Sequence, residues 1–401
     1  MMNCRNIGLV FLGLMLMWHV EGKSQATYYD TKFKLSKEDF VITVPIEVES
    51  DQIFIRIQIR GRQYRFKLDT GASQGVLYDD VQIKGLKETG SIKSTDAVGH
   101  TREVMTVELP SFQIEMLTVS GYKMQRMHRR FPKKGEDGII GFALFNGGVA
   151  AKIDTHKGQI TLTDDKKLFS KEKGEIVKYR MINHVPYINV SPFEGLEVEA
   201  RFDTGSPRLF EIDSDRYAQI DKTISLKSSK EVGQTFGSRF GGHFGRENPD
   251  TITFLSLQRL MWGNYSFRDV HCSTLKGKTH VGAQILDYGS IIIDPFRKRL
   301  IFQPYNNATS CVVKNSQKQD VAIVEKDGKA MLGMVMEKSK AWLDGFRQGY
   351  TIEKVNGKPL NFGEFCNYRW VLNQKYSFTL RSPKRKETIV TAFWPLQYNK
   401  K

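Results

Sequence analysis

The hydrophobic positions of this chain fall into short runs rather than long periodic stretches. β-Branched and aromatic residues come in small groups, and Gly, Asn and Pro separate these groups along most of the sequence. Runs of this kind are typical of β-strands joined by turns. The pattern therefore predicts a mostly β protein, and its 401 residues are enough for two or three domains with cores of their own.

One apolar run breaks this pattern, at the amino terminus. Arg5 precedes a continuous apolar stretch over residues 7–18, and Ser24-Gln25-Ala26 has the small residues of a cleavage site. This order is typical of a secretory signal peptide, and the run is short for a transmembrane helix. We expect residues 1–26 to be removed and the mature protein to be periplasmic or extracellular, without stable membrane insertion. The alternative is an envelope protein anchored by an uncleaved N-terminal segment.

The rest of the chain contains a duplicated pattern. Asp-Thr-Gly occurs at residues 69–71 and again at 203–205, each time after a strand-like apolar approach. A hydrophobic element that ends in Gly follows each copy, because Gly141 comes 72 positions after Asp69 and Gly282 comes 79 positions after Asp203. Repeats in matching register indicate two copies of one structural unit. The sequence thus predicts two small all-β lobes, over residues 27–177 and 178–306.

Two aspartates in equivalent turns suggest hydrolytic chemistry. Two carboxylates about 3 Å apart cannot both ionise, so one takes a proton from a water molecule while the other donates one. The hydroxyl of the neighbouring Thr can bond the backbone of the opposite lobe and lock the turns together. Gly permits the tight turn and a close approach of backbone to carboxylate.

These turns resemble those of the pepsin-like and retropepsin-like aspartic peptidases, and both lobes together are similar to a fused two-lobe form. The resemblance implies a mostly β, two-lobed β-barrel fold with an internal duplication and an Asp69/Asp203 dyad that hydrolyses peptide bonds with a bound water, without cofactor or metal. It implies that the dyad is supported by Thr70, Gly71, Thr204, Gly205 and Ser206. Flaps that close over a substrate are expected at hairpins that contain Gly99 and His100 in the first lobe and Gly241 and Gly242 in the second.

A third unit is expected over residues 320–401, after a polar linker at 307–319. Ser339-Lys340-Ala341 is suited to begin a short helix, and Val355-Asn356-Gly357-Lys358 is suited to end a strand. This stretch resembles a bacterial PDZ domain, which implies a small αβ fold that captures a C-terminal peptide by strand addition. The candidate carboxylate-binding loop contains Leu332, Gly333 and Met334. The alternative is a small αβ domain that only packs on the lobes.

Charge and motif content narrow the function classes. The formal net charge is +16, and one basic cluster lies at residues 126–134. A basic surface attracts anionic glycans, membranes or acidic peptides. Aromatic residues do not recur at stacking intervals in this cluster, so no nucleic-acid partner is expected. Neither Cys-x-x-Cys nor His-x-x-x-His occurs, which leaves a zinc site unsupported.

Three cysteines remain after the signal segment, in a chain expected to reach an oxidising compartment. One disulfide and one free thiol are possible, with Cys272–Cys311 as the more plausible pair and Cys366 left over. Three buried thiols are an equally open alternative.

The function predicted from these observations is an exported, monomeric aspartic endopeptidase that acts on a peptide or protein substrate, with a PDZ unit that recruits peptide or protein. The first alternative is a catalytically inactive peptide-binding protein on the same fold. The second is an envelope-binding protein that uses the basic side chains of Arg129, Arg130, Lys133 and Lys134.

Overall fold

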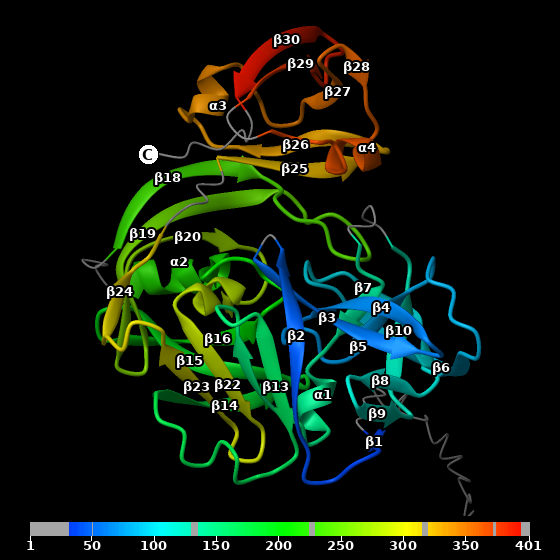
Figure 1. Ribbon diagram of the computed structural model, residues 1–401. Helices are drawn as coiled ribbons and strands as arrows, with labels where there is room; N and C mark the ends of the chain where they lie inside the picture. The colour runs from blue at the N-terminus through cyan, green and yellow to red at the C-terminus, as the bar shows by residue number, and fades with distance from the viewer. Residues whose placement is uncertain are drawn as a thin grey trace, which may run out of the picture.

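The computed structural model describes residues 32–49, 51–129, 135–223, 229–314, 320–371 and 374–393. The signal segment, part of the basic cluster and the last five residues of the linker (315–319) lie outside these ranges, so the predictions made for them stay predictions. Figure 1 shows two β-rich lobes side by side and a smaller unit that lies against β18 and β19 of the second lobe. The mostly β, two-lobed fold class predicted from the sequence is confirmed.

The first lobe consists of strands, with one short helix. Alternating residues of β2 are buried, as expected for a strand with one face on a core. The elements of this lobe are β1 (Lys34–Leu35), β2 (Val41–Glu49), β3 (Gln52–Ile59), β4 (Arg62–Leu68), β5 (Gly75–Tyr78), β6 (Lys87–Thr95), β7 (Thr101–Glu108), β8 (Phe112–Ile114), β9 (Leu117–Ser120), β10 (Lys123–Met127), β11 (Gly138–Ile140), α1 (Ala143–Asn146), β12 (Ala150–Asp154) and β13 (Gln159–Thr163).

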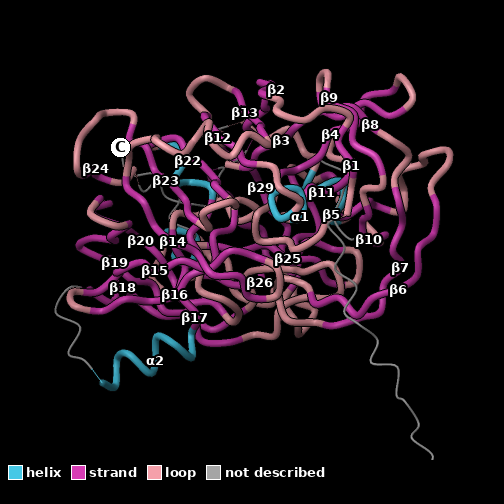
Figure 2. The backbone as a smooth tube through the Cα atoms, turned by 90° about the horizontal axis from the view of Figure 1, so that it is seen from below, coloured by secondary structure: helices cyan, strands magenta, loops and turns pink. Residues whose placement is uncertain are grey.

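The second lobe repeats this order, with an added helix α2 at its outer side (Figure 2). The elements are β14 (Glu175–Ile182), β15 (Val185–Phe193), β16 (Leu196–Asp203), β17 (Phe210–Asp213), α2 (Ser214–Thr223), β18 (Ser229–Gly237), β19 (Asp250–Trp262), β20 (Tyr265–Leu275), β21 (His280–Gly282), the 3-10 helix η1 (Ala283–Asp287), β22 (Gly289–Asp294), β23 (Arg299–Pro304) and β24 (Ser310–Val312).

The strand pairings demonstrate the duplication. In the first lobe β11 runs parallel to β4 and antiparallel to β5, while β10 runs parallel to β5. In the second lobe β21 runs parallel to β16 and antiparallel to β17, while β20 runs parallel to β17. The hairpin β6–β7 of the first lobe corresponds in the same way to the hairpin β18–β19 of the second.

A six-stranded antiparallel sheet joins the lobes, in the order β2-β13-β12-β22-β23-β14. Its two central strands come from different lobes, since Ala151 of β12 pairs with Ile293 of β22. The strand β22 is buried along its whole length, in agreement with its apolar sequence. One continuous hydrophobic core runs through both lobes. The two aspartate turns therefore stand on one rigid base.

The C-terminal unit has a separate core, centred on residues such as Phe346 and Phe378. Its sheet has the order β25-β26-β27-β29-β30, and β28 pairs with β27. The elements are β25 (Val321–Lys326), β26 (Lys329–Val335), α3 (Lys340–Leu343), β27 (Thr351–Val355), β28 (Lys358–Pro359), α4 (Phe362–Cys366), β29 (Lys375–Arg381) and β30 (Glu387–Phe393). Ser339 caps α3 through its side chain, as its position before the helix predicts.

The cysteines Cys272, Cys311 and Cys366 are free thiols, so the Cys272–Cys311 disulfide is not formed. The register explains this, because Cys311 pairs opposite Phe267 while Cys272 lies five residues further along the same strand β20. That offset is about 16 Å along a strand, whereas bridged Cα atoms lie less than about 7 Å apart. No helix within the described ranges is long and apolar enough to cross a membrane.

Candidate active site

The two Asp-Thr-Gly turns lie at equivalent strand ends. Asp69 follows the last residue of β4, and Asp203 is the last residue of β16. The hydrophobic elements that end in Gly141 and Gly282 run parallel to these strands and support the turns from behind. A Cβ atom at Gly141 would meet the backbone of Ala72, just after the first turn, and one at Gly282 would meet the backbone after the second. Each of these two hydrophobic elements therefore needs Gly at its end, because that residue packs directly on the aspartate turn.

The threonines lock the two turns together across the lobes. The backbone N–H of Thr70 donates to Oγ1 of Thr204 at 3.0 Å, and the N–H of Thr204 donates to Oγ1 of Thr70 at 3.0 Å. Each hydroxyl then donates to the strand before the opposite aspartate, Thr70 to the carbonyl of Phe202 at 2.8 Å and Thr204 to that of Leu68 at 2.9 Å. Both threonines are fully buried. The four bonds fix the relative position of the two aspartates.

The glycines bring each turn against the carboxylate of the other. A Cβ atom at Gly71 would overlap the carboxylate of Asp203, and one at Gly205 would overlap that of Asp69. The N–H of Gly71 donates to Oδ1 of Asp69 at 3.0 Å, and the N–H of Gly205 donates to Oδ1 of Asp203 at 3.0 Å. Each carboxyl group is therefore held by its own turn and lies against the glycine of the other turn.

A cation stands beside each aspartate. Lys67 Nζ lies 3.3 Å from Oδ2 of Asp69, and an Nη2 of Arg201 donates to Oδ2 of Asp203 at 2.6 Å. Both cations come two residues before their aspartate, and this spacing places both side chains on the same face of a strand. Their side chains are only 18% and 19% exposed, so these ion pairs are weakly screened.

The pKa values of the two aspartates differ in direction. Burial raises the pKa of Asp69, and the nearby charge of Asp203 adds to this effect against the opposing charge of Lys67. Burial also acts on Asp203, but the Arg201 guanidinium, the nearby His280 and Lys67 side chains and a hydrogen bond from Asp69 together outweigh it, so the pKa of Asp203 lies below its ordinary value. The arrangement thus favours one proton on the pair, held by Asp69 and shared with an ionised Asp203.

Ser206 lies after the second turn, but its hydroxyl is bonded to the ring of His280. The distance from Ser206 Oγ to His280 Nε2 is 2.8 Å, and Arg201 is the side chain that contacts the outer oxygen of Asp203. His280 Nε2 also lies 3.4 Å from Glu211, which is fully buried and pairs with Arg239 at 2.9 Å. Burial opposes ionisation of Glu211, but the two neighbouring arginines hold its pKa well below the ordinary range. The His280 that begins the second Gly element is therefore part of a buried charge network.

The two flap candidates meet each other. Gly99 and His100 lie at the tip of the hairpin β6–β7, and Gly241 and Gly242 lie in the loop after β18. Packing is close, because a Cβ atom at Gly242 would overlap the carboxylate of Asp96. Asp96 accepts the N–H of His100 at 2.9 Å through one oxygen, and the N–H of Phe244 at 2.9 Å through the other. One carboxylate thus holds the first hairpin's own turn and the tip of the second hairpin.

Leu332, Gly333 and Met334 lie inside β26 and not in a loop, so this part of the prediction is wrong. The strand packs on the second lobe at this point. The N–H of Ser238 donates to the carbonyl of Gly333 at 2.9 Å, and Met334 packs against Ile252 of β19. The apolar run was long enough to continue the strand, and its Gly is needed for close contact with the backbone of residue 238.

Several side chains of the site were not singled out from the sequence. Lys67 and Arg201 lie in the apolar segments that lead into the two turns. Their position two residues before Asp is a signal that each cation lies on the same face of its strand as the aspartate. The pairing of Glu211 with Arg239 had no such signal, because it depends on how β17 and the hairpin loop pack. Within the part of the chain that the structure describes, no group of three or more His, Cys, Asp or Glu side chains is placed to hold a metal ion.

Comparisons with known proteins gave matches among solved structures alone. No family model and no curated protein matches this sequence. Among solved structures, 371 chains match. One is the crystal structure of an aspartic proteinase from Irpex lacteus, with a TM-score of 0.45 and 17% sequence identity, and the match covers 68% of this chain and 100% of that chain.

Proposed function

We propose that this protein is an aspartic endopeptidase that hydrolyses peptide bonds with Asp69 and Asp203. The observation that carries the proposal is the pair of mirrored turns, in which the threonines bond across the lobes and each glycine packs on the opposite carboxylate. Two carboxyl groups held face to face are suited to share one proton. This is the protonation pattern that general acid–base hydrolysis needs.

The direction of the two pKa values assigns the roles. Asp203 is the base, because the Arg201 guanidinium and the Asp69 hydrogen bond outweigh its burial and keep its pKa low. A water molecule between the carboxyl groups loses a proton to Asp203 while its oxygen attacks the carbonyl carbon. Asp69 gives its proton to the carbonyl oxygen. Collapse of the tetrahedral intermediate then breaks the C–N bond: the proton on Asp203 passes to the leaving amine, and one hydroxyl of the intermediate returns a proton to Asp69 as the carbonyl of the acid product forms. The dyad ends with one proton, as it began.

The two hairpins supply the cover that such a reaction needs. Their tips meet through Asp96, and β6–β7 and β18–β19 come from different lobes. A substrate strand that enters the cleft has to separate or lift these tips. Closure over a bound strand excludes water from the reacting groups.

The C-terminal unit is proposed to recruit peptide or protein, and the N-terminal segment to direct export. The outer strand β30 supports recruitment, since it lies at the edge of its sheet and exposes Ile389. An exposed edge can take an added strand. The stretch from Leu332 to Met334 is not available for this, because it packs on the second lobe.

The test is cleavage of an unfolded protein by the purified full chain between about pH 3 and pH 8, the range in which carboxyl dyads titrate. Products are identified by mass spectrometry. Asp69→Asn and Asp203→Asn should each abolish cleavage while the protein stays folded. Asp221→Asn, in the peripheral helix α2, is the matched control and should cleave normally. Cleavage that survives both dyad substitutions would sink the proposal, and binding without any cleavage would favour a peptide-binding role instead.

A further inference from the structure

The cations beside the dyad form a mirrored pair. Lys67 and Arg201 occupy equivalent positions in the two copies, and each contacts the outer oxygen of its own aspartate. The duplication of the fold therefore places one positive charge on each side of the dyad. Both side chains are mostly buried, and a buried lysine or arginine is rare in proteins unless it is paired.

The charge balance of this group is positive in the working state. With one proton on the dyad, the two aspartates carry one negative charge in total, while Lys67 and Arg201 carry two positive charges. Burial disfavours charge on both cations, yet the aspartates raise the pKa of Lys67 and of Arg201 above their ordinary values. One positive charge is thus left without a counter-charge in a site of low exposure, where electrostatic interactions are strong.

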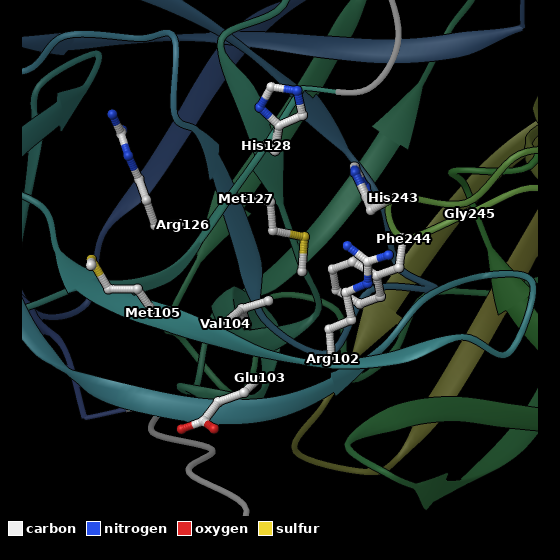
Figure 3. Close-up of a pocket in the computed structure, with 10 residues that line it drawn as sticks. All are labelled: Arg102, Glu103, Val104, Met105, Arg126, Met127, His128, His243, Phe244 and Gly245. Carbon is white, nitrogen blue, oxygen red and sulfur yellow. The ribbon is translucent and has the colours of Figure 1, made fainter. Parts of the chain in front are cut away.

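A pocket lined in part by cations lies in the first lobe. It has a volume of about 530 Å³ and lies between β7, β10 and the tip of the second hairpin. Figure 3 shows Arg102 over the ring of Phe244 and beside His243. Arg126 also lines the pocket, and the Met127 side chain provides an apolar wall. A pocket with cations and an apolar wall suits a short acidic side chain with its methylene groups.

The acidic residues around this pocket already have partners. The carboxylate of Asp79 contacts His128 at 2.9 Å, and Glu103, which points away from His243 in Figure 3, bonds to Ser91. In contrast, Nη1 of Arg126 and Nδ1 of His243 are buried without a hydrogen-bond partner among the described residues. Buried polar atoms are nearly always bonded in native proteins. Arg126 is held in place through Nη2, which donates to the carbonyls of Asp79 and Val81, so these two side chains keep hydrogen-bonding capacity that the described residues do not use.

Tyr78 links the pocket lining with the cation beside Asp69. The rings of Tyr78 and His243 lie 5.9 Å apart. Burial and the positive charge of Lys67 lower the pKa of His243 to about 4, so the charge beside Asp69 acts on the pocket lining. We therefore expect a substrate strand bound over the dyad to bring a neighbouring side chain within reach of the pocket.

We propose that the cleft selects peptides with acidic side chains next to the scissile bond, through Lys67 and Arg201 at the dyad and Arg102 and Arg126 in the adjoining pocket. This proposal rests on the proposed function. A glutamate or aspartate of the substrate supplies the counter-charge that the singly protonated dyad lacks. Glutamine or asparagine has the same shape but leaves that charge unpaired.

The experiment compares matched peptides. Cleavage sites are first mapped by mass spectrometry on a proteome-derived peptide library, where Asp and Glu should be enriched beside the cut. Two synthetic peptides then differ only by Glu→Gln at those positions. We expect kcat/KM at pH 6 to be at least about tenfold higher for the acidic peptide, as charge complementarity at an interface discriminates between partners. Equal values would overturn the proposal and leave the endopeptidase function intact.

Variants locate the selectivity. Arg102→Met, outside the dyad, should raise KM severalfold more for the acidic peptide than for the neutral one, so the ratio of the two kcat/KM values should fall. Arg180→Met is the matched control, because Arg180 pairs with Glu199 on the surface and should not change the ratio. If the wild type cleaves neither peptide, binding of the two labelled peptides to the full chain is measured by fluorescence anisotropy. Tighter binding of the acidic peptide would support the proposal even if cleavage fails, and equal affinity would reject it.

Discussion

The hydrogen bonds that Thr70 and Thr204 make across the lobes allow a quantitative prediction. Thr70→Val preserves shape and removes one hydroxyl, and with it two hydrogen bonds. The N–H of Thr204 loses its acceptor, and the carbonyl of Phe202 loses its donor. Both groups are buried where water cannot replace the bond. A buried polar group left unpaired costs about 1–3 kcal/mol, so the two together should lower the free energy of unfolding by about 3 kcal/mol.

The duplication makes this prediction symmetrical. Thr204→Val deprives the N–H of Thr70 and the carbonyl of Leu68 in the same way, so its cost should be similar. For a unit of this size each kcal/mol lowers Tm by about 2–4 °C, which gives a fall of about 6–12 °C for each variant. The double variant should lose less than the sum, because the first substitution already loosens the geometry that the other pair needs.

The assay is urea and thermal unfolding followed by tryptophan fluorescence and circular dichroism. Thr70→Ser and Thr204→Ser are the matched controls, since serine keeps the hydroxyl and loses only a methyl group. The serine variants should retain most of the stability. A loss below about 1 kcal/mol for both valine variants, or equal losses for serine and valine, would refute the reasoning, because an unpaired buried group costs at least that much.

Three further predictions concern charge and space at the site. Arg201→Met should move the acid limb of the pH profile of kcat/KM to higher pH, because loss of the guanidinium raises the pKa of the base Asp203. Glu211→Gln should cost about 3–5 kcal/mol of stability in urea unfolding at pH 7, as it leaves buried arginines unpaired. Because the folded pKa of Glu211 lies below its unfolded value, its stabilisation is present above the unfolded pKa and is lost as pH falls, so the variant should also flatten the acid side of the stability profile. Gly205→Ala should abolish cleavage, since the added methyl overlaps the Asp69 carboxylate.

A control variant or a pH profile tests each of these three predictions. Arg201→Lys keeps the charge and should keep the acid limb near that of the wild type; a limb that moves equally in both variants would count against an electrostatic cause. An unchanged acid-side stability profile for the Glu211 variant would contradict its pKa direction. Gly233→Ala is the control for added volume, because only the end of Met336 lies near that position. Equal activity of the two alanine variants would mean that the dyad tolerates the methyl group.

The repeat explains why so much of the fold was predictable. Asp-Thr-Gly needs a glycine for close approach to the opposite carboxylate, and the later element needs a glycine to pack on the turn. Both requirements are visible in the sequence as glycines at similar spacing. The Thr70–Thr204 bonds and the meeting of the hairpins near Gly99 and Gly242 follow from placing two such copies face to face.

The remaining features depend on packing between distant segments. Leu332–Met334 is apolar enough for either a loop beside Gly or a buried strand, and contact with the second lobe decides for the strand. The thiols of Cys272 and Cys311 are separated by register along β20, which cysteine order does not reveal. The pair of Glu211 and Arg239 spans two elements whose approach no local pattern encodes.

The six-stranded sheet that joins the lobes predicts how the protein behaves when its chain is cut in two. Its halves, β2-β13-β12 and β22-β23-β14, meet along β12 and β22, and the chain crosses from one half to the other between β13 and β14. A cut within residues 164–174 would give two fragments, each with one aspartate and one newly open sheet edge. Such edges pair readily. The fragments should reassemble by complementation. Peptidase activity would then report the reassembly, because neither fragment carries both aspartates.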